Sequence, residues 1–372
     1  MRVVATMLSP AYSILPSTRI TSFRQQLGFN HACAAPKGLQ VDQARAARLV
    51  CSAAPEQPQS LALNSDEELL QLLRARQPEG ATRPGAVHLV GTGPGDPGLL
   101  TLRALHLMQT ADVVLYDRLV SEDILSMVHA GAIMVYVGKQ RGFHTRTQDE
   151  IHDLLLHFTR EGATVIRLKG GDPYVFGRGG EEAQFLEAQG VRVHVVPGIT
   201  AASGISAELG VPLTHRGLAT SVRFLTGHAR EGGELDLDNS VATGVDPFTT
   251  LVIYMGLSTL PSLTRQLSAA GLSLDTPAVA VERGTTAQQR SVYAELGALQ
   301  EQVMKAALES PTLIIIGPVV GLAQGWRQYQ ETGESLEGPP SDLEDFAAER
   351  RVQVPQTAEL PPRVRQLLSR SA

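Results

Sequence analysis

The sequence predicts an α/β fold of two domains, each built on a mainly parallel or mixed five-stranded sheet. From Ala86 onward, short apolar segments alternate with longer amphipathic segments, as in strands followed by helices. The alternation starts again after residues 211–217, so a second unit of the same kind is expected. The chain has 372 residues, 43% hydrophobic and 19% charged, which suits a globular enzyme with two cores.

The expected elements of the first unit alternate regularly. Its candidate strands cover residues 86–91, 113–117, 133–138, 164–168 and 192–196. Apolar residues spaced three and four apart predict helices over residues 99–110, 123–129, 148–160 and 181–188. The second unit has candidate strands at residues 221–226, 250–255, 278–282, 290–294 and 312–316. These two sets predict one α/β domain over residues 86–214 and another over residues 215–328.

The segments outside the two domains have a different composition. Residues 1–55 contain six basic residues against a single acid, Asp42, which is typical of an organelle transit peptide; a basic tail without an address is the alternative. A linker follows over residues 56–85, with a helix-like run in which Ser65 and Glu68 form a candidate capping box. Residues 329–372 are expected to be a mobile tail.

Several classes of function are disfavoured by composition. A formal net charge of -6 argues against a nucleic-acid binder, and the apolar run at residues 313–316 is far too short to span a membrane. The two cysteines, Cys33 and Cys51, both fall in the predicted leader, so no thiol chemistry is expected in the catalytic body. His144 and His157 lack metal-ligand spacing, and no metal is expected.

A glycine-rich loop at residues 91–98 follows the first candidate strand, and Asp117 ends the next one, which superficially suits a dinucleotide site. Asp96 opposes that interpretation. With Pro97 favourable at the first position of a helix, Asp96 is expected to be the N-cap, where its carboxylate would repel a diphosphate. A ligand without phosphate meets no such objection, and a turn that binds nothing explains the glycines equally well.

Further motifs follow in a fixed order along the chain. They are Gly93-Pro94-Gly95-Asp96, Tyr116-Asp117-Arg118-Leu119-Val120, Val137-Gly138-Lys139, the runs at residues 167–182 and 196–204, and Pro212-Leu213-Thr214-His215-Arg216. Together they resemble the tetrapyrrole methylase family, and within it the enzymes that methylate uroporphyrinogen III, from about residue 87 to residue 326. The resemblance implies two α/β domains, usually in a homodimer, with S-adenosylmethionine and a tetrapyrrole bound in the cleft between the domains.

The resemblance also places residues on cofactor-binding positions. They are Pro94, Gly170, Gly171, Asp172, Val175, Thr200, Ala201, Met255 and Gly284. Glycines at a strand end let backbone groups approach a ligand, Thr200 can present a hydroxyl at a helix start, and Met255 can offer a soft contact to adenine. Turn glycines, an N-cap threonine and a core methionine are the alternatives for single residues.

The resemblance further implies that Asp117 is a proton acceptor and Lys139 a proton donor. The expected nucleophile is an electron-rich pyrrole carbon of the substrate, which attacks the sulfonium methyl group and later loses a proton. Proximity and alignment are therefore expected to dominate the rate. Asp117 as a strand-end cap and Lys139 as a carboxylate clamp remain alternatives.

Uroporphyrinogen III carries eight carboxylates, so its pocket needs concentrated cations. Besides Lys139, the substrate-binding candidates are Arg118, Arg141, Arg146, Arg178, His215, Arg216 and Arg223. Solvated surface charge is the alternative for any one of them.

The implied activity is two successive methyl transfers to uroporphyrinogen III, giving precorrin-2 for sirohaem, without oxidation or iron insertion. The implied place is the plastid stroma, with the mitochondrion as alternative. Another methylase of the same fold, such as a later corrin-pathway enzyme, remains open. Two alternatives from other functional classes also remain open: a nicotinamide-dependent dehydrogenase, and a module that binds S-adenosylmethionine without catalysing a reaction.

Overall fold

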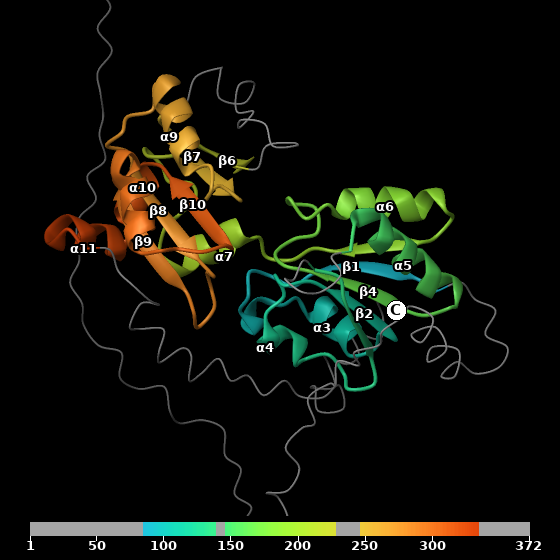
Figure 1. Cartoon of the computed structure of the whole chain (residues 1–372). Coiled ribbons are helices and arrows are strands. Elements are labelled where there is room, and N and C mark those ends of the chain that lie inside the picture. Colours follow the sequence, from blue (N-terminus) through green and yellow to red (C-terminus); the bar gives the residue numbers. More distant parts are fainter. Residues whose placement is uncertain (1–84, 139–145, 228–245, 335–372) are drawn as a thin grey trace, which may run out of the picture. The chain divides into compact units, whose positions relative to one another are not determined.

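The computed structural model describes residues 85–138, 146–227 and 246–334, drawn in colour in Figure 1. Within these residues the chain forms two five-stranded sheets, one parallel and one mixed, which confirms the predicted fold class. Several sequence predictions fall outside the described residues. They concern the leader, the linker, residues 335–372 of the tail, and the site candidates Lys139 and Arg141.

The first sheet has the strand order β3-β2-β4-β1-β5, and all of its strand pairs are parallel. Its strands are β1 (Val87–Gly91), β2 (Val113–Tyr116), β3 (Ile133–Tyr136), β4 (Val165–Lys169) and β5 (Val193–Val196). Strand β4 lies in the middle, and all five of its residues are buried. The carboxyl ends of all five strands meet at one edge of the sheet, the carboxyl edge.

Helices cover both faces of this sheet, as Figure 1 shows. The helices α3 (Leu102–Met108) and α4 (Glu122–Leu125) pack on one face, against Ile166 and Leu168 of β4. The helices α5 (Gln148–Arg160) and α6 (Gly179–Ala188) pack on the opposite face of the sheet, in the apolar cluster that contains Val165 of β4. Because side chains alternate along a strand, Arg167 and Lys169 share the face of Val165.

The second sheet has the order β6-β7-β10-β8-β9, in which only β6 and β7 pair in parallel. Its strands are β6 (Ser221–Thr226), β7 (Thr249–Tyr254), β8 (Pro277–Glu282), β9 (Arg290–Glu295) and β10 (Thr312–Ile316). The helices α9 (Leu260–Ala269) and α10 (Leu296–Lys305) cover one face. The other face packs against α7 (Ala201–Glu208), the 3₁₀ turn η3 (Pro318–Leu322) and α11 (Gln324–Thr332).

The predicted strands agree with the observed ones to within one or two residues, but the helices agree less well. The helix expected over residues 99–110 is broken into a 3₁₀ turn, η1 (Pro97–Leu99), and α3. The break arises because Asp96 caps the first turn and Thr101 caps the second, with Leu100 extended between them. The helix expected over residues 123–129 is only the single turn α4.

Helix α7 precedes the predicted domain boundary at residue 214, yet it packs on the second sheet. The boundary itself stays a prediction. Helix α11 extends beyond Trp326 to Thr332, so the first residues of the predicted tail are helical. Within the described ranges, no helix combines the length and apolar character needed to cross a membrane.

Candidate functional site

The motif segments that the structure describes in the first unit gather at the carboxyl edge of the first sheet. The loops after β1 and β4 are joined there by a backbone pair, in which Gly93 N donates to Gly171 O and Gly171 N donates to Gly93 O. A Cβ atom on Gly198, in the loop after β5, would lie 2.2 Å from Gly171 O and 2.8 Å from the carbonyl carbon of Gly91. Three loops thus meet backbone to backbone, which explains the glycines at these positions.

Asp172 holds the loop after β4 in place. One of its carboxylate oxygens accepts a hydrogen bond from Gly198 N at 3.1 Å, and the other accepts from Tyr174 N at 2.8 Å. Gly171, just before it, adopts the left-handed conformation with φ +71°. The predicted cofactor position Asp172 therefore also fixes the shape of its own loop.

Helix α7 brings several predicted cofactor positions together. Thr200 is its N-cap and accepts a hydrogen bond from Ser203 N, which is the capping role that the sequence offered as the alternative to a cofactor contact. Along the helix, a Cβ atom on Gly204 would lie 2.6 Å from the Pro94 ring. Ile205 approaches Gly284 so closely that a Cβ on the glycine would lie 2.4 Å from its side chain. The helix thus contacts the loop after β1 and the loop after β8.

The start of α7 also contacts the end of β7. Ala202 N donates a hydrogen bond to the Tyr254 hydroxyl at 3.1 Å. The Tyr254 ring lies 5.0 Å from that of Phe176, in the loop after β4, and 5.9 Å from that of Phe224 on β6. Burial raises the pKa of Tyr254, so its hydroxyl stays protonated at neutral pH. Met255 follows Tyr254 in the chain and therefore lies next to this aromatic cluster.

Backbone strain is concentrated on the same loops. Of the six non-glycine residues with positive φ in the described ranges, five follow β4, β7 or β8. They are Phe176, Arg178, Met255, Arg283 and Thr285. A residue keeps such a strained conformation only where the surrounding structure holds it there, and residues of this kind are found most often at functional sites. This concentration supports a site at these strand ends.

Exposed apolar side chains are also frequent here. Six of the ten large hydrophobic residues described as exposed lie on or beside these loops and strand ends: Leu119, Tyr174, Phe176, Ile199, Phe224 and Met255. Exposed apolar side chains suit contact with an adenine or a pyrrole ring.

Asp96 accepts a hydrogen bond from Gly98 N at 2.8 Å, and its predicted N-cap role is confirmed. Because this carboxylate would repel a diphosphate, the residues present fit a cosubstrate without phosphate.

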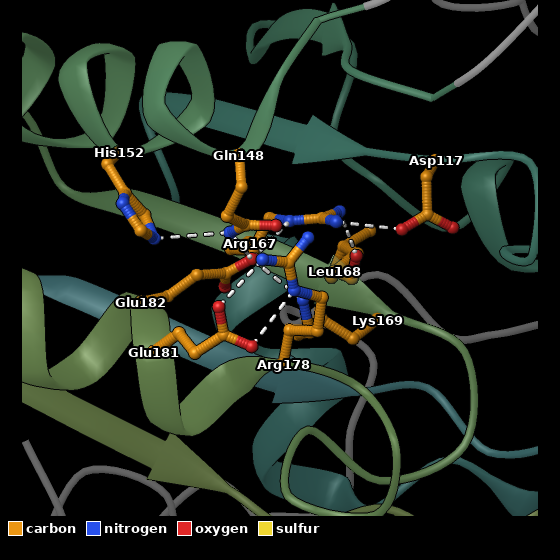
Figure 2. A network of polar contacts seen from close by, with 9 residues as sticks. All are labelled: Asp117, Gln148, His152, Arg167, Leu168, Lys169, Arg178, Glu181 and Glu182. Atoms are coloured by element: carbon orange, nitrogen blue, oxygen red, sulfur yellow. Dashed lines mark hydrogen bonds and ion pairs between the residues drawn. The ribbon is translucent and has the colours of Figure 1, made fainter. Parts of the chain in front are cut away.

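Asp117, the predicted proton acceptor, is held at both carboxylate oxygens (Figure 2). Oδ1 accepts from Leu119 N at 3.0 Å, as expected of a strand-end cap, and Oδ2 accepts from Arg167 Nη2 at 2.8 Å. The side chain retains 20% of its exposure, whereas that of Arg167 retains only 5%. A buried guanidinium thus holds a carboxylate that solvent still reaches.

Arg167 belongs to a larger buried network, also drawn in Figure 2. Glu182 on α6 is fully buried, and its Oε1 accepts from Lys169 Nζ at 2.8 Å and from Gln148 Nε2 at 3.2 Å. The same oxygen lies 3.6 Å from Arg167 Nε. Burial and the neighbouring guanidinium lower the pKa of Lys169, while Glu182 opposes that shift.

Arg167, Lys169 and Glu182 fall within the motif run at residues 167–182, but the sequence did not predict that they form a network. A signal was present, because two cations spaced two residues apart in an otherwise apolar central strand must share one buried face. Buried charges require a countercharge. Tyr254 and Phe176 were also missed as site residues, and their signal was weaker because each lies beside a stronger motif residue.

The predicted substrate-binding cations are spread over both units. Arg118 is exposed in the loop after β2, Arg146 precedes α5, and Arg223 is exposed on the edge strand β6. Arg178 forms a two-point ion pair with Glu181, at 2.9 and 2.7 Å, which raises the pKa of the guanidinium.

His215 and Arg216 lie exposed in the turn that follows α7, where His215 Nδ1 is 2.9 Å from the carbonyl oxygen of Arg216. The substrate-binding role of all these cations stays a prediction. Among the residues that the structure describes, no group of three or more His, Cys, Asp or Glu side chains is placed to hold a metal ion.

Comparison with known proteins gives consistent matches. Residues 86–300 match the profile of the family described as Tetrapyrrole (Corrin/Porphyrin) Methylases. The chain is 61% identical over 264 residues to the S-adenosyl-L-methionine-dependent uroporphyrinogen III methyltransferase, chloroplastic, of Arabidopsis thaliana, covering 70% of this chain and 71% of that protein. It is 50% identical over 256 residues to a siroheme synthase of Chromobacterium violaceum, of which the match spans 54%.

Solved structures agree with these matches. The uroporphyrin-III C-methyl transferase of Thermus thermophilus, in complex with S-adenyl homocysteine, is similar with a TM-score of 0.55 and 45% identity, over 63% of this chain and 99% of that one. A cobalt precorrin-4 methyltransferase is similar with a TM-score of 0.55 and 28% identity, over 63% of this chain and 95% of that one.

Proposed function

Because the chain belongs to the tetrapyrrole methylase family, we propose that it transfers methyl groups from S-adenosyl-L-methionine to carbon atoms of uroporphyrinogen III. The observation that carries the substrate is the 61% identity to the Arabidopsis thaliana protein named for this reaction. The identity to the cobalt precorrin-4 methyltransferase is much lower, at 28%. Uroporphyrinogen III is therefore favoured over a later corrin as the methyl acceptor.

We place the cosubstrate against the loops after β1, β4, β7 and β8 and the start of α7. Met255 and Ile199 offer exposed apolar surface there, which suits adenine. S-adenosyl-L-methionine, when bound, supplies an electrophilic methyl group. The chain's own residues then have to exclude water and hold the acceptor carbon in line.

We assign Asp117 to proton transfer or to orienting the reacting ring. Its carboxylate is held at both oxygens but remains 20% exposed, so it can still face a ligand. A held carboxylate suits a step in which the methylated ring loses its proton, because the acceptor needs no reorientation. Lys139, the proposed donor, lies outside the described residues, and its role stays a prediction from the resemblance.

The dehydrogenase alternative is disfavoured by the local geometry at Asp96. Its carboxylate accepts a hydrogen bond from Gly98 N, and Pro97 supplies no N–H at the first position of η1. A diphosphate at this turn would meet a negative charge in place of free amides. The match to the siroheme synthases covers about half of their length, so the proposal concerns methyl transfer alone.

We further propose plastid import and a homodimeric enzyme. The basic composition of residues 1–55 and the chloroplastic relative support import, with the mitochondrion as the alternative address. A fluorescent protein fused after residue 60 tests plastid import: fluorescence confined to plastids is expected, and diffuse cytosolic fluorescence would contradict the proposal.

Analytical ultracentrifugation of the full chain tests the proposed homodimer. A monomer mass at working concentration would contradict the dimer.

The activity is tested with the full chain, S-adenosyl-L-methionine and enzymatically generated uroporphyrinogen III under anaerobic conditions. A change in the absorbance of the tetrapyrrole is expected together with release of S-adenosyl-L-homocysteine, and both should depend on each substrate. Release of S-adenosyl-L-homocysteine with a later corrin intermediate, and none with uroporphyrinogen III, would favour the alternative methylase.

A further inference from the structure

Strand β4 carries two cations into the interior of the first domain. Val165, Arg167 and Lys169 share the face covered by α5 and α6, but only Val165 is apolar. The side chains of Arg167 and Lys169 are 5% and 6% exposed. Buried charges of this kind are costly unless they are paired, so the sequence must supply partners for both.

Two carboxylates balance these two cations. Glu182 Oε1 lies 2.8 Å from Lys169 Nζ and 3.6 Å from Arg167 Nε, and Asp117 Oδ2 lies 2.8 Å from Arg167 Nη2. Figure 2 shows Arg167 extending from this cluster toward Asp117. The four charges sum to zero, and they connect α6 to the loop after β2 through the central strand.

Every side of the Arg167 guanidinium faces a partner. Nη1 donates to Leu168 O at 2.7 Å, Nη2 donates to Asp117, and Nε faces Glu182. Arg167 Nε makes no hydrogen bond at its 3.6 Å separation, so Glu182 acts on it as a charge. Because a guanidinium is planar, fixing two of its sides fixes the third.

The network has an inner end and an outer end. Glu182 is fully buried, and Asp117 is the most exposed of the four charged side chains. Asp117 also lies in one of the motif loops at the carboxyl edge. The Glu182 side chain contacts Gln148, Arg167 and Lys169, none of which is a predicted substrate position. Its backbone N–H donates to Arg178 O, so an effect of Glu182 on the reaction can pass through Asp117, through Arg178 or through the end of β4.

We propose that Glu182 and Arg167 are positioning residues for Asp117. Glu182 holds Arg167 by its charge, and Arg167 fixes the direction in which the Asp117 carboxylate faces the substrate. This proposal rests on the proposed function, because it needs the reaction in which Asp117 takes part. It adds two residues that contact neither substrate but determine the rate of the chemical step.

The test measures steady-state methylation by variants of the full chain. Glu182→Gln keeps the size of the side chain but removes its charge, and Arg167→Gln removes the group that contacts Asp117. Each should lower kcat by about tenfold or more while KM for both substrates changes by about twofold or less. Arg167→Lys keeps the charge and should recover part of the lost kcat.

Leu186→Ala is the matched control for loss of packing. Leu186 lies one turn beyond Glu182 on α6, is fully buried, and belongs to the apolar cluster that contains Val165. The control should lower Tm at least as much as Glu182→Gln and leave kcat near that of the unmodified protein. An equal loss of kcat in Leu186→Ala and Glu182→Gln would overturn the proposal, because both losses would then be structural.

A double-mutant cycle with Asp117→Asn separates action through Asp117 from an independent effect. The loss of kcat caused by Glu182→Gln should vanish when Asp117 is already asparagine. Independent, multiplicative losses would overturn the proposal. If Asp117→Asn forms no product even in a single turnover, the pair Arg167→Lys and Arg167→Gln decides, and equal rates for the two would overturn it.

The same measurements distinguish this proposal from the proposed function. If the unmodified chain binds S-adenosyl-L-methionine but methylates no uroporphyrinogen III, the proposed function fails. If the unmodified chain is active and Glu182→Gln or Arg167→Gln keeps its full kcat, only the positioning proposal fails.

Discussion

Gly93 and Gly171 exchange two backbone hydrogen bonds across the carboxyl edge of the first sheet, at 3.2 and 2.7 Å. The pair is an isolated antiparallel bridge, formed after the parallel strands β1 and β4 have ended. It joins the loop that carries Pro94 to the loop that carries Asp172. Gly198 packs against the same bridge, so the shape of the predicted cofactor site depends on backbone contacts that side chains cannot replace.

Gly198→Ala should destabilise the protein by about 1–3 kcal/mol, because an added Cβ would lie 2.2 Å from the backbone oxygen of Gly171 and neither can rotate away. The measurement is Tm by calorimetry. Gly180→Ala is the control, since Gly180 is exposed on α6 with no atom near its Cβ position. The control should raise stability by up to about 1 kcal/mol. A Gly198→Ala protein as stable as the unmodified one would contradict the close packing.

Met255→Gly should separate stability from cofactor binding. Met255 has φ +55° and is 50% exposed, so glycine relieves backbone strain and removes little buried surface. Tm should stay the same or rise, while the affinity for S-adenosyl-L-homocysteine, measured by isothermal titration calorimetry, should fall by about tenfold. Unchanged affinity would remove Met255 from the predicted cofactor site.

His88 should make stability depend on pH in the acidic range. Burial, then His194 and Arg103, lower the pKa of His88 from 6.5 to about 4. Between these values the unfolded chain binds a proton that the folded chain does not, so stability falls as pH drops from about 6.5 toward 4.

His88→Phe should reduce this dependence. The His88 ring stacks on His194 with centroids 5.1 Å apart, and its Nδ1 is buried without a hydrogen-bond partner, so an aromatic replacement keeps the stacking. Thermal unfolding at pH 7 and pH 5 measures the difference. The unmodified protein should lose more Tm on acidification than the variant, and equal losses in both would contradict the assigned pKa shift.

The strands could be predicted closely because short apolar runs bounded by turns are a local signal. The two sheets and the N-cap role of Asp96 followed from residue types alone. Helix boundaries were less predictable, because the break at Leu100 depends on two capping residues that act in succession.

The contacts that build the site could not be predicted from the sequence. Strand order decides that Gly93 meets Gly171 and that Arg167 reaches Asp117, fifty residues earlier in the chain. The packing of α7 on the second sheet likewise depends on tertiary contacts of Ala202 and Ile205. Motif order predicted a set of site residues, and the structure shows that several of them contact one another.

The most direct test of the central claim is the mass of the tetrapyrrole formed from uroporphyrinogen III and S-adenosyl-L-methionine with a deuterated methyl group. The expected product has gained two labelled methyl groups and has lost no hydrogen through oxidation. A product with a different number of labelled methyl groups would contradict the claim. So would an unlabelled tetrapyrrole recovered from a protein that binds S-adenosyl-L-methionine.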